Sequence, residues 1–208
     1  MIAVADAKGS ITLARSLLWL TVAWNAVEGV VAVSAGFIAG SVALVGFGLD
    51  SFIEVTAAAI LLWRIGLLDD DERVEQRERL AHRIVGATFI VLACYIMAQT
   101  AYVFATGDEP ESSAVGVILS IVSLLVMPVI GLAKRWNARR LGSRALVAES
   151  TETLVCSYLS LTLFIGLAAN AMLGWWWADP IAALAMVPWI AKEGLEGLRG
   201  ESCEDSPA

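Results

Sequence analysis

Residues 40–54 read GSVALVGFGLDSFIE, and this stretch decides how the chain folds. It opens an apolar run, residues 42–63, that is long enough to cross the hydrocarbon core of a bilayer as one helix. Two acids interrupt the run, Asp50 and Glu54, and their spacing of four places both on one face of that helix. Because acidic side chains inside a membrane are costly, this pair indicates a functional site.

The same pattern returns later in the chain, where residues 142–156 read GSRALVAESTETLVC. Five of the first six positions are identical in the two stretches, and alignment without a gap sets Asp50 opposite Glu152 and Glu54 opposite Cys156. Asp50 and Glu152 each follow their glycine by ten residues. That distance is a rise of roughly 15 Å along a helix, which predicts that both acids lie near the midplane of the membrane.

The composition predicts that the rest of the chain is membrane-embedded as well. Of the 208 residues, 58% are apolar and only 17% are charged, which is too few charges for the polar surface of a soluble domain. We therefore predict an all-α membrane protein, a single domain of residues 1–208 without a cytoplasmic domain after its last helix. Six apolar runs are expected to span the bilayer: 16–37, 42–63, 84–105, 114–133, 145–173 and 181–198.

The basic residues predict the orientation of these helices. All fourteen Lys and Arg lie at the amino terminus, in the second and fourth connections, or in the last helix and its tail. Since successive crossings alternate sides, the positive-inside rule places both termini in the cytoplasm, with the protein in a plasma (inner) membrane. The two three-helix halves then form an inverted pseudo-repeat, an arrangement common in secondary transporters. The formal net charge of -7 does not favour a nucleic-acid partner.

The paired positions of the repeat make a candidate metal site. Side chains on two helices can converge to offer carboxylate oxygens and one thiolate, a ligand set that divalent transition metals accept. The expected ligands are Asp50, Glu54, Glu152 and Cys156.

Three further polar side chains are expected at accessory positions near this depth, as ligands or proton relays. They are Glu28, Asn25 and Glu149. No Lys or Arg is expected within reach of the deep carboxyl groups. Acids without a counter-ion must be protonated, bind a cation, or alternate between the two. Acids that switch between a protonated and a metal-bound state predict a transporter that exchanges metal for protons by alternating access.

Two other functions use similar residues. A transporter of sodium or of an organic cation would also need buried carboxylates. An intramembrane enzyme could use a pair of glutamates as acid and base. The sequence offers no nucleophile beside a histidine, since the single histidine, His82, lies outside the apolar runs. We therefore expect no enzyme activity, no catalytic residue and no bound cofactor.

The two stretches also resemble a known family. GSVALVGFGLDSFIE is similar to the second helix of the cation diffusion facilitator (cation efflux) family, whose Asp/His-x-x-x-Asp pair binds metal. ALVAESTETLVC resembles its fifth helix, and ADPIAAL resembles the opening of its sixth. The resemblance implies that the four expected ligands occupy the family's metal positions. It also implies export of zinc or a related divalent ion in exchange for protons.

The resemblance further implies a homodimer. Within the family, the chain looks most like the short branch that consists of the membrane domain alone. A dimer would then form through membrane helices, or through the charged stretch 69–83, which is expected to extend the third helix into the cytoplasm.

Overall fold

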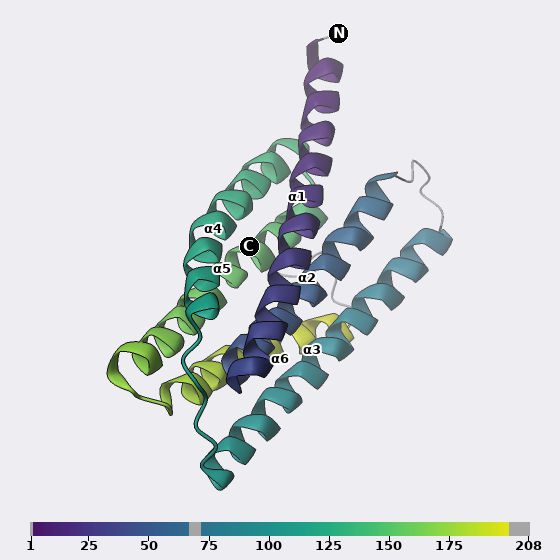
Figure 1. Cartoon of the computed structure of the whole chain (residues 1–208). Coiled ribbons are helices and arrows are strands. Elements are labelled where there is room, and N and C mark those ends of the chain that lie inside the picture. Colours follow the sequence, from purple (N-terminus) through teal and green to yellow (C-terminus); the bar gives the residue numbers. More distant parts are fainter. Residues whose placement is uncertain (1, 67–71, 200–208) are drawn as a thin grey trace.

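The computed structural model describes residues 2–66 and 72–199, and within these ranges the only regular structure is helical. Six helices follow one another along the chain (Figure 1): α1 (Ile2–Ala39), α2 (Val42–Gly66), α3 (Glu72–Thr106), α4 (Ala114–Leu141), α5 (Arg144–Leu173) and α6 (Ala178–Arg199). The prediction of an all-α membrane protein is confirmed. Among the described residues, α1 to α5 contain segments long and apolar enough to cross a membrane. Helix α6 falls outside that group because charged residues crowd its last turns.

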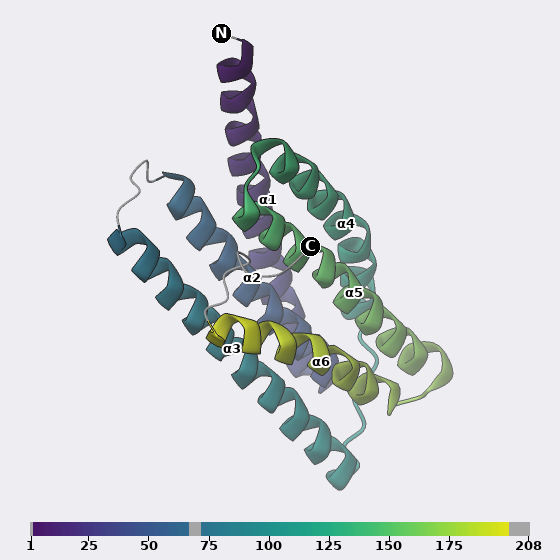
Figure 2. The ribbon, with the colours of Figure 1, turned by 180° about the vertical axis from the view of Figure 1, so that it is seen from behind.

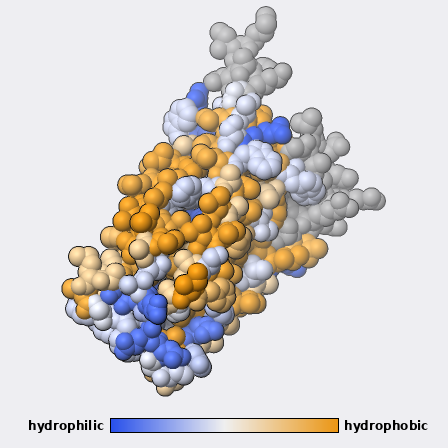
Figure 3. Space-filling view, viewed as in Figure 1, coloured by the Kyte–Doolittle hydropathy of each residue, from blue (hydrophilic) through white to orange (hydrophobic). Residues whose placement is uncertain are grey.

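The surface has the banding of a membrane protein. On the face shown in Figure 3, hydrophobic side chains cover the middle of the bundle and hydrophilic residues gather toward its ends. Large apolar side chains are exposed on several helices, including Phe37, Val91 and Leu125. Exposure of such an apolar surface to water is unfavourable, whereas lipid tails are as apolar as these side chains.

The internal repeat has a local structural cause. Gly40 and Gly142 both adopt a left-handed backbone conformation, with φ of 65° and 63°, which ends the preceding helix. The serine that follows each glycine caps the next helix: Ser41 Oγ accepts from Leu44 N at 3.0 Å, and Ser143 Oγ accepts from the N–H of Leu146 at 3.3 Å. The repeated Gly-Ser pair is therefore a helix stop followed by a helix start.

Helix α2 lies at the centre of the bundle, where it packs against α1, α3, α5 and α6. Helix α1 packs on α2 in the first half of the repeat, and α4 packs on α5 in the same way in the second half. Helices α3 and α6 run side by side (Figure 2). Their close approach needs glycine at position 86, where a methyl group would lie 2.7 Å from the backbone carbonyl carbon of Gly197.

Helix α6 is tied to the start of α2 by a buried carboxylate. Asp179 Oδ1 accepts from Ser41 Oγ at 2.5 Å, and Asp179 Oδ2 accepts from the Val42 N–H at 3.0 Å. Asp179 thus satisfies N–H groups that the first turn of α2 leaves unpaired. These bonds hold the amino-terminal ends of α2 and α6 against each other.

Three helices extend well beyond their predicted spans. Helix α1 begins at Ile2 rather than near 16. Helix α4 does not end near 133 but continues to Leu141, so Lys134 lies inside the helix. Helix α3 begins at Glu72, which confirms for residues 72–83 that the charged stretch extends the third helix. The side chain of His82 lies outside the described part of the structure.

Candidate cation site

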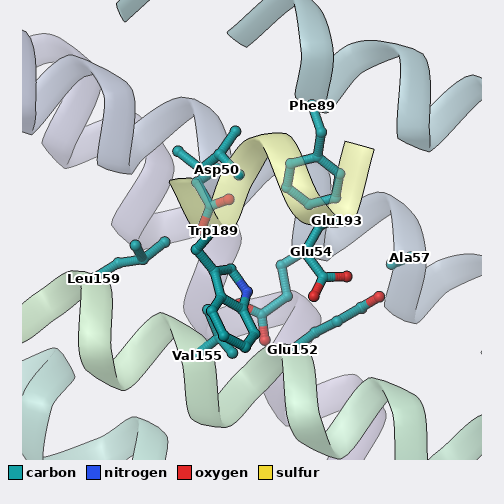
Figure 4. A pocket seen from close by; sticks show the side chains of 10 residues that line it. Asp50, Glu54, Ala57, Phe89, Glu152, Val155, Leu159, Trp189 and Glu193 are labelled. Carbon is teal, nitrogen blue, oxygen red and sulfur yellow. The ribbon is translucent and has the colours of Figure 1, made fainter. Parts of the chain in front are cut away.

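Acids from both halves of the repeat border one cavity between α2, α3, α5 and α6 (Figure 4). Asp50 and Glu54 are on α2, one helical turn apart, and are only 7% and 6% exposed. Glu152 reaches the same cavity from α5. The structure therefore brings together three of the four side chains expected to bind metal, and the spacing of four on α2 is what aims its two acids in the same direction.

A fourth acid borders the cavity, and the sequence analysis missed it. Glu193 projects from α6 and lines the cavity with Trp189, which is four residues earlier on the same helix (Figure 4). Residue 193 lies inside the predicted span 181–198, but the sequence analysis named no acid of that span as a candidate ligand. The spacing between Trp189 and Glu193 was the available signal, since it places both on one helical face.

Apolar and aromatic side chains make up the rest of the wall. They come from all four helices: Ala57, Phe89, Val155, Leu159, Trp189 and Ile190. A cavity with four carboxyl groups in an apolar wall favours positive charge, because an apolar wall screens charge less than bulk water does.

Cys156 lies on a different side of the site. It is 1% exposed and sits beside the Glu54 carboxyl, yet it is not among the residues that border the cavity. Among the side chains that the structure describes, no group of three or more His, Cys, Asp or Glu is arranged to hold a metal ion. In this conformation the expected ligands are neighbours rather than an assembled coordination sphere.

The expectation that no basic residue reaches the deep acids is wrong. Lys134 of α4 is completely buried, and its Nζ lies 2.7 Å from Glu149 Oε1 in an ion pair. The same ammonium group donates to Thr153 Oγ1 at 2.8 Å. Lys134 follows an apolar run that ends at 133, so it resembled an interfacial residue in the sequence. Helix α4 continues past that point and turns the side chain toward α5.

The other two accessory residues lie in a polar layer between α1 and α2. Glu28 is 1% exposed, and its Oε2 accepts from Ser51 Oγ at 3.3 Å. Asn25 is fully buried, donates to the Thr21 carbonyl at 3.1 Å, and lies beside the Glu54 carboxyl. Both residues thus stand behind α2, near the site but not on the cavity wall.

Two curated proteins are similar to this chain in sequence. The chain is similar to transmembrane protein 163 of Xenopus laevis, with 24% identity over 147 residues, covering 71% of this chain and 52% of that protein. It is also similar to the uncharacterized transporter sll1263 of Synechocystis sp., with 25% identity over 156 residues, covering 72% of this chain and 50% of that protein. The chain therefore spans about half the length of the curated relatives it matches.

A family-level match covers almost all of the bundle. Residues 18–200 match the cation efflux transmembrane domain, a range that includes every acid on the cavity wall. Together with the six-helix arrangement and the cavity acids contributed by both halves of the repeat, this match shows that the chain belongs to the cation efflux family.

Proposed function

We propose that the protein exports a divalent transition-metal cation, zinc in the first instance, from the cytoplasm in exchange for protons. The transported ion would be bound by Asp50, Glu54, Glu152 and Cys156. Membership of the cation efflux family supports cation transport as such. The choice of ion, the coupling to protons and the ligand set are the proposal.

One observation carries the proposal: acids from both halves of the inverted repeat, Asp50 and Glu54 from α2 and Glu152 from α5, border one cavity. Carboxyl groups that border one cavity raise each other's cost of ionisation unless a cation lies among them. They therefore hold either protons or a metal ion, and each displaces the other. The soft sulfur of Cys156, beside Glu54, would favour zinc or cadmium once it joins the ligands.

The orientation follows from the basic residues. With both termini in the cytoplasm of an inner or plasma membrane, the α2–α3 and α4–α5 connections face the cytoplasm. Glu193 lies toward the cytoplasmic end of α6 in this orientation, so its carboxyl group would attract a cation arriving from that side. A homodimer would form through the apolar surface of the membrane helices.

Transport by the purified protein in liposomes tests the proposal. A zinc-sensitive dye is enclosed in the vesicles, the interior is made acidic, and zinc is added outside. Zinc should enter these vesicles faster than vesicles without protein. Molecules inserted in either orientation contribute to this uptake. Collapse of the proton gradient with an ionophore should slow that uptake.

Isosteric variants connect uptake to the site. Asp50→Asn and Glu152→Gln should reduce zinc uptake at least tenfold, because each loses an anionic ligand. Glu109→Gln is the matched control, since this exposed acid lies in the α3–α4 connection. Wild-type rates in both site variants would show that zinc does not pass through this cavity.

An organic cation is the second candidate, favoured by the aromatic side chains of Phe89 and Trp189 on the cavity wall. Aromatic rings attract cations, and the Trp189 ring already has Lys192 Nζ 4.7 Å from its centroid. Competition distinguishes the two. If tetraethylammonium accumulates in the vesicles and zinc neither accumulates nor competes with it, the protein transports organic cations.

A further inference from the structure

Three of the four acids on the cavity wall have no partner among the residues that the structure describes. Glu54 is the exception, because its Oε1 accepts from Thr153 Oγ1 at 2.8 Å. The acids that take part in no hydrogen bond or ion pair with a described residue are Asp50, Glu152 and Glu193. Asp50 faces the cavity and is only 7% exposed, so it is also shielded from bulk water. Because buried polar groups are normally satisfied, unpaired carboxyl groups on this wall indicate that the cavity receives a cation.

Helix packing fixes the position of Glu193 on the wall. The last turns of α6 lie close against α3, since a methyl group at Gly194 would lie 2.6 Å from Ile90 Cδ1. Figure 4 shows the Glu193 side chain extending from α6 into the same space as the side chains of Glu54 and Glu152. The charge of Glu193 acts on the Glu152 carboxyl as well. Carboxyl groups from α2, α5 and α6 therefore meet at one side of the cavity.

Cys156 does not have this access to the cavity. It is 1% exposed and lies beside the Glu54 carboxyl, off the cavity wall. Glu193 is on the wall and only half-buried, which makes it more accessible from outside than Asp50 and Glu54. A cation that enters the cavity in this conformation therefore meets the oxygens of Glu193 before it can reach the sulfur of Cys156.

We propose that Glu193 is a direct ligand of the incoming divalent cation, and that Cys156 replaces it when the transport site closes around the ion. The loading site then consists of four carboxyl groups from three helices: Asp50, Glu54, Glu152 and Glu193. These acids border one cavity without forming a coordination sphere, so they draw together around the ion when it binds. This inference rests on the proposed function, because it concerns how that same site is loaded.

Cobalt binding tests the role of Glu193, since cobalt binds to the same kinds of ligand as zinc and its absorption spectrum reports its ligands. Cobalt alone is titrated into the purified protein in detergent. Glu193→Gln should weaken cobalt binding at least tenfold, because even the hydrogen-bond partners of metal ligands contribute about 10- to 100-fold to affinity. Glu196→Gln is the matched control, because this exposed acid of α6 pairs with Lys192 at 3.6 Å. Its cobalt affinity should equal that of the wild type.

A thiol introduced at position 193 distinguishes direct coordination from attraction at a distance. The three cysteines of the chain are first replaced by serine. This cysteine-free protein should still bind cobalt, because the loading site contains no thiol. With Glu193→Cys added, bound cobalt should give the ultraviolet charge-transfer band of a thiolate ligand. Glu196→Cys in the same cysteine-free protein should give no such band, since that position lies off the cavity wall.

Each result is taken from protein that elutes from a sizing column like the wild type. Unchanged cobalt affinity in Glu193→Gln would overturn the proposal, and so would cobalt bound to Glu193→Cys without the thiolate band. Loss of cobalt binding in the cysteine-free protein would also overturn it. The test is separable from that of transport. A wild type that binds neither cobalt nor zinc refutes the proposed function itself, whereas zinc transport with unchanged cobalt affinity in Glu193→Gln refutes only the role of Glu193.

Discussion

Replacement of Lys134 by methionine should destabilise the protein far more than replacement of both Lys134 and Glu149. The Nζ to Oε1 distance of 2.7 Å lies between side chains that are 0% and 5% exposed. At an effective dielectric constant of about 20, the attraction between the two charges is about 6 kcal/mol. The desolvation cost of burying both charges opposes it. In Lys134→Met, the Glu149 carboxylate is still buried, but the positive charge that attracts it is gone.

The loss in free energy of unfolding should be about 3–5 kcal/mol for Lys134→Met and somewhat less for Glu149→Gln, whose amide can still accept from the lysine. The double variant Lys134→Met/Glu149→Gln should lose no more than about 2 kcal/mol, because neither charge is left alone. Unfolding in mixed micelles with increasing SDS measures all three, with the fluorescence of the eight tryptophans as the signal.

An exposed ion pair provides the control for this cycle. Lys192 Nζ and Glu196 Oε1 are 3.6 Å apart on α6, with side chains 54% and 44% exposed. The corresponding variants, Lys192→Met and Glu196→Gln, should change stability by less than about 1 kcal/mol. If the losses for Lys134→Met and Glu149→Gln simply add in the double variant, the two charges do not stabilise each other and the reasoning fails.

Further predictions concern the site and the helix contacts. Cys156→Asp should keep transport but lower the preference for cadmium over manganese in competition assays, since a carboxylate suits harder ions; equal preference in both proteins would show that the thiol only packs. Asp179→Ala should lower stability by about 0.5–2 kcal/mol through loss of the α2 cap at Ser41, and SDS unfolding measures it; Asp179→Asn, which retains an acceptor, should lose less. Gly86→Ala should separate α3 from α6 at Gly197 and cost about 1–3 kcal/mol, and wild-type stability would contradict the close contact.

Much of the fold could be predicted because its signals are local. A helix that crosses a bilayer must be about twenty apolar residues long, so its position can be read directly from the sequence. The ends are local as well. The Gly-Ser pairs at 40–41 and 142–143 produce a helix stop and a cap through bonds within a few residues. The acids of α2 were predicted correctly to share one face, since that depends only on helical periodicity.

The partners of these acids could not be predicted, because they depend on how each helix is rotated against its neighbours. Apolar sequence alone leaves that rotation open, since lipid and protein interior are equally apolar. The packed bundle turns Lys134 inward to Glu149, turns Glu193 toward the cavity, and places Cys156 beside the cavity rather than on its wall.

Length, hydropathy and periodicity along single chain segments therefore predicted the helices and the shared face of the two acids on α2. Which charges meet depends on the packing of the helices. The link from Lys134 through Thr153 to Glu54 joins three helices, and residues 134 and 54 are far apart in the chain. Such a contact depends on how side chains pack between helices, and no local pattern in the sequence encodes it.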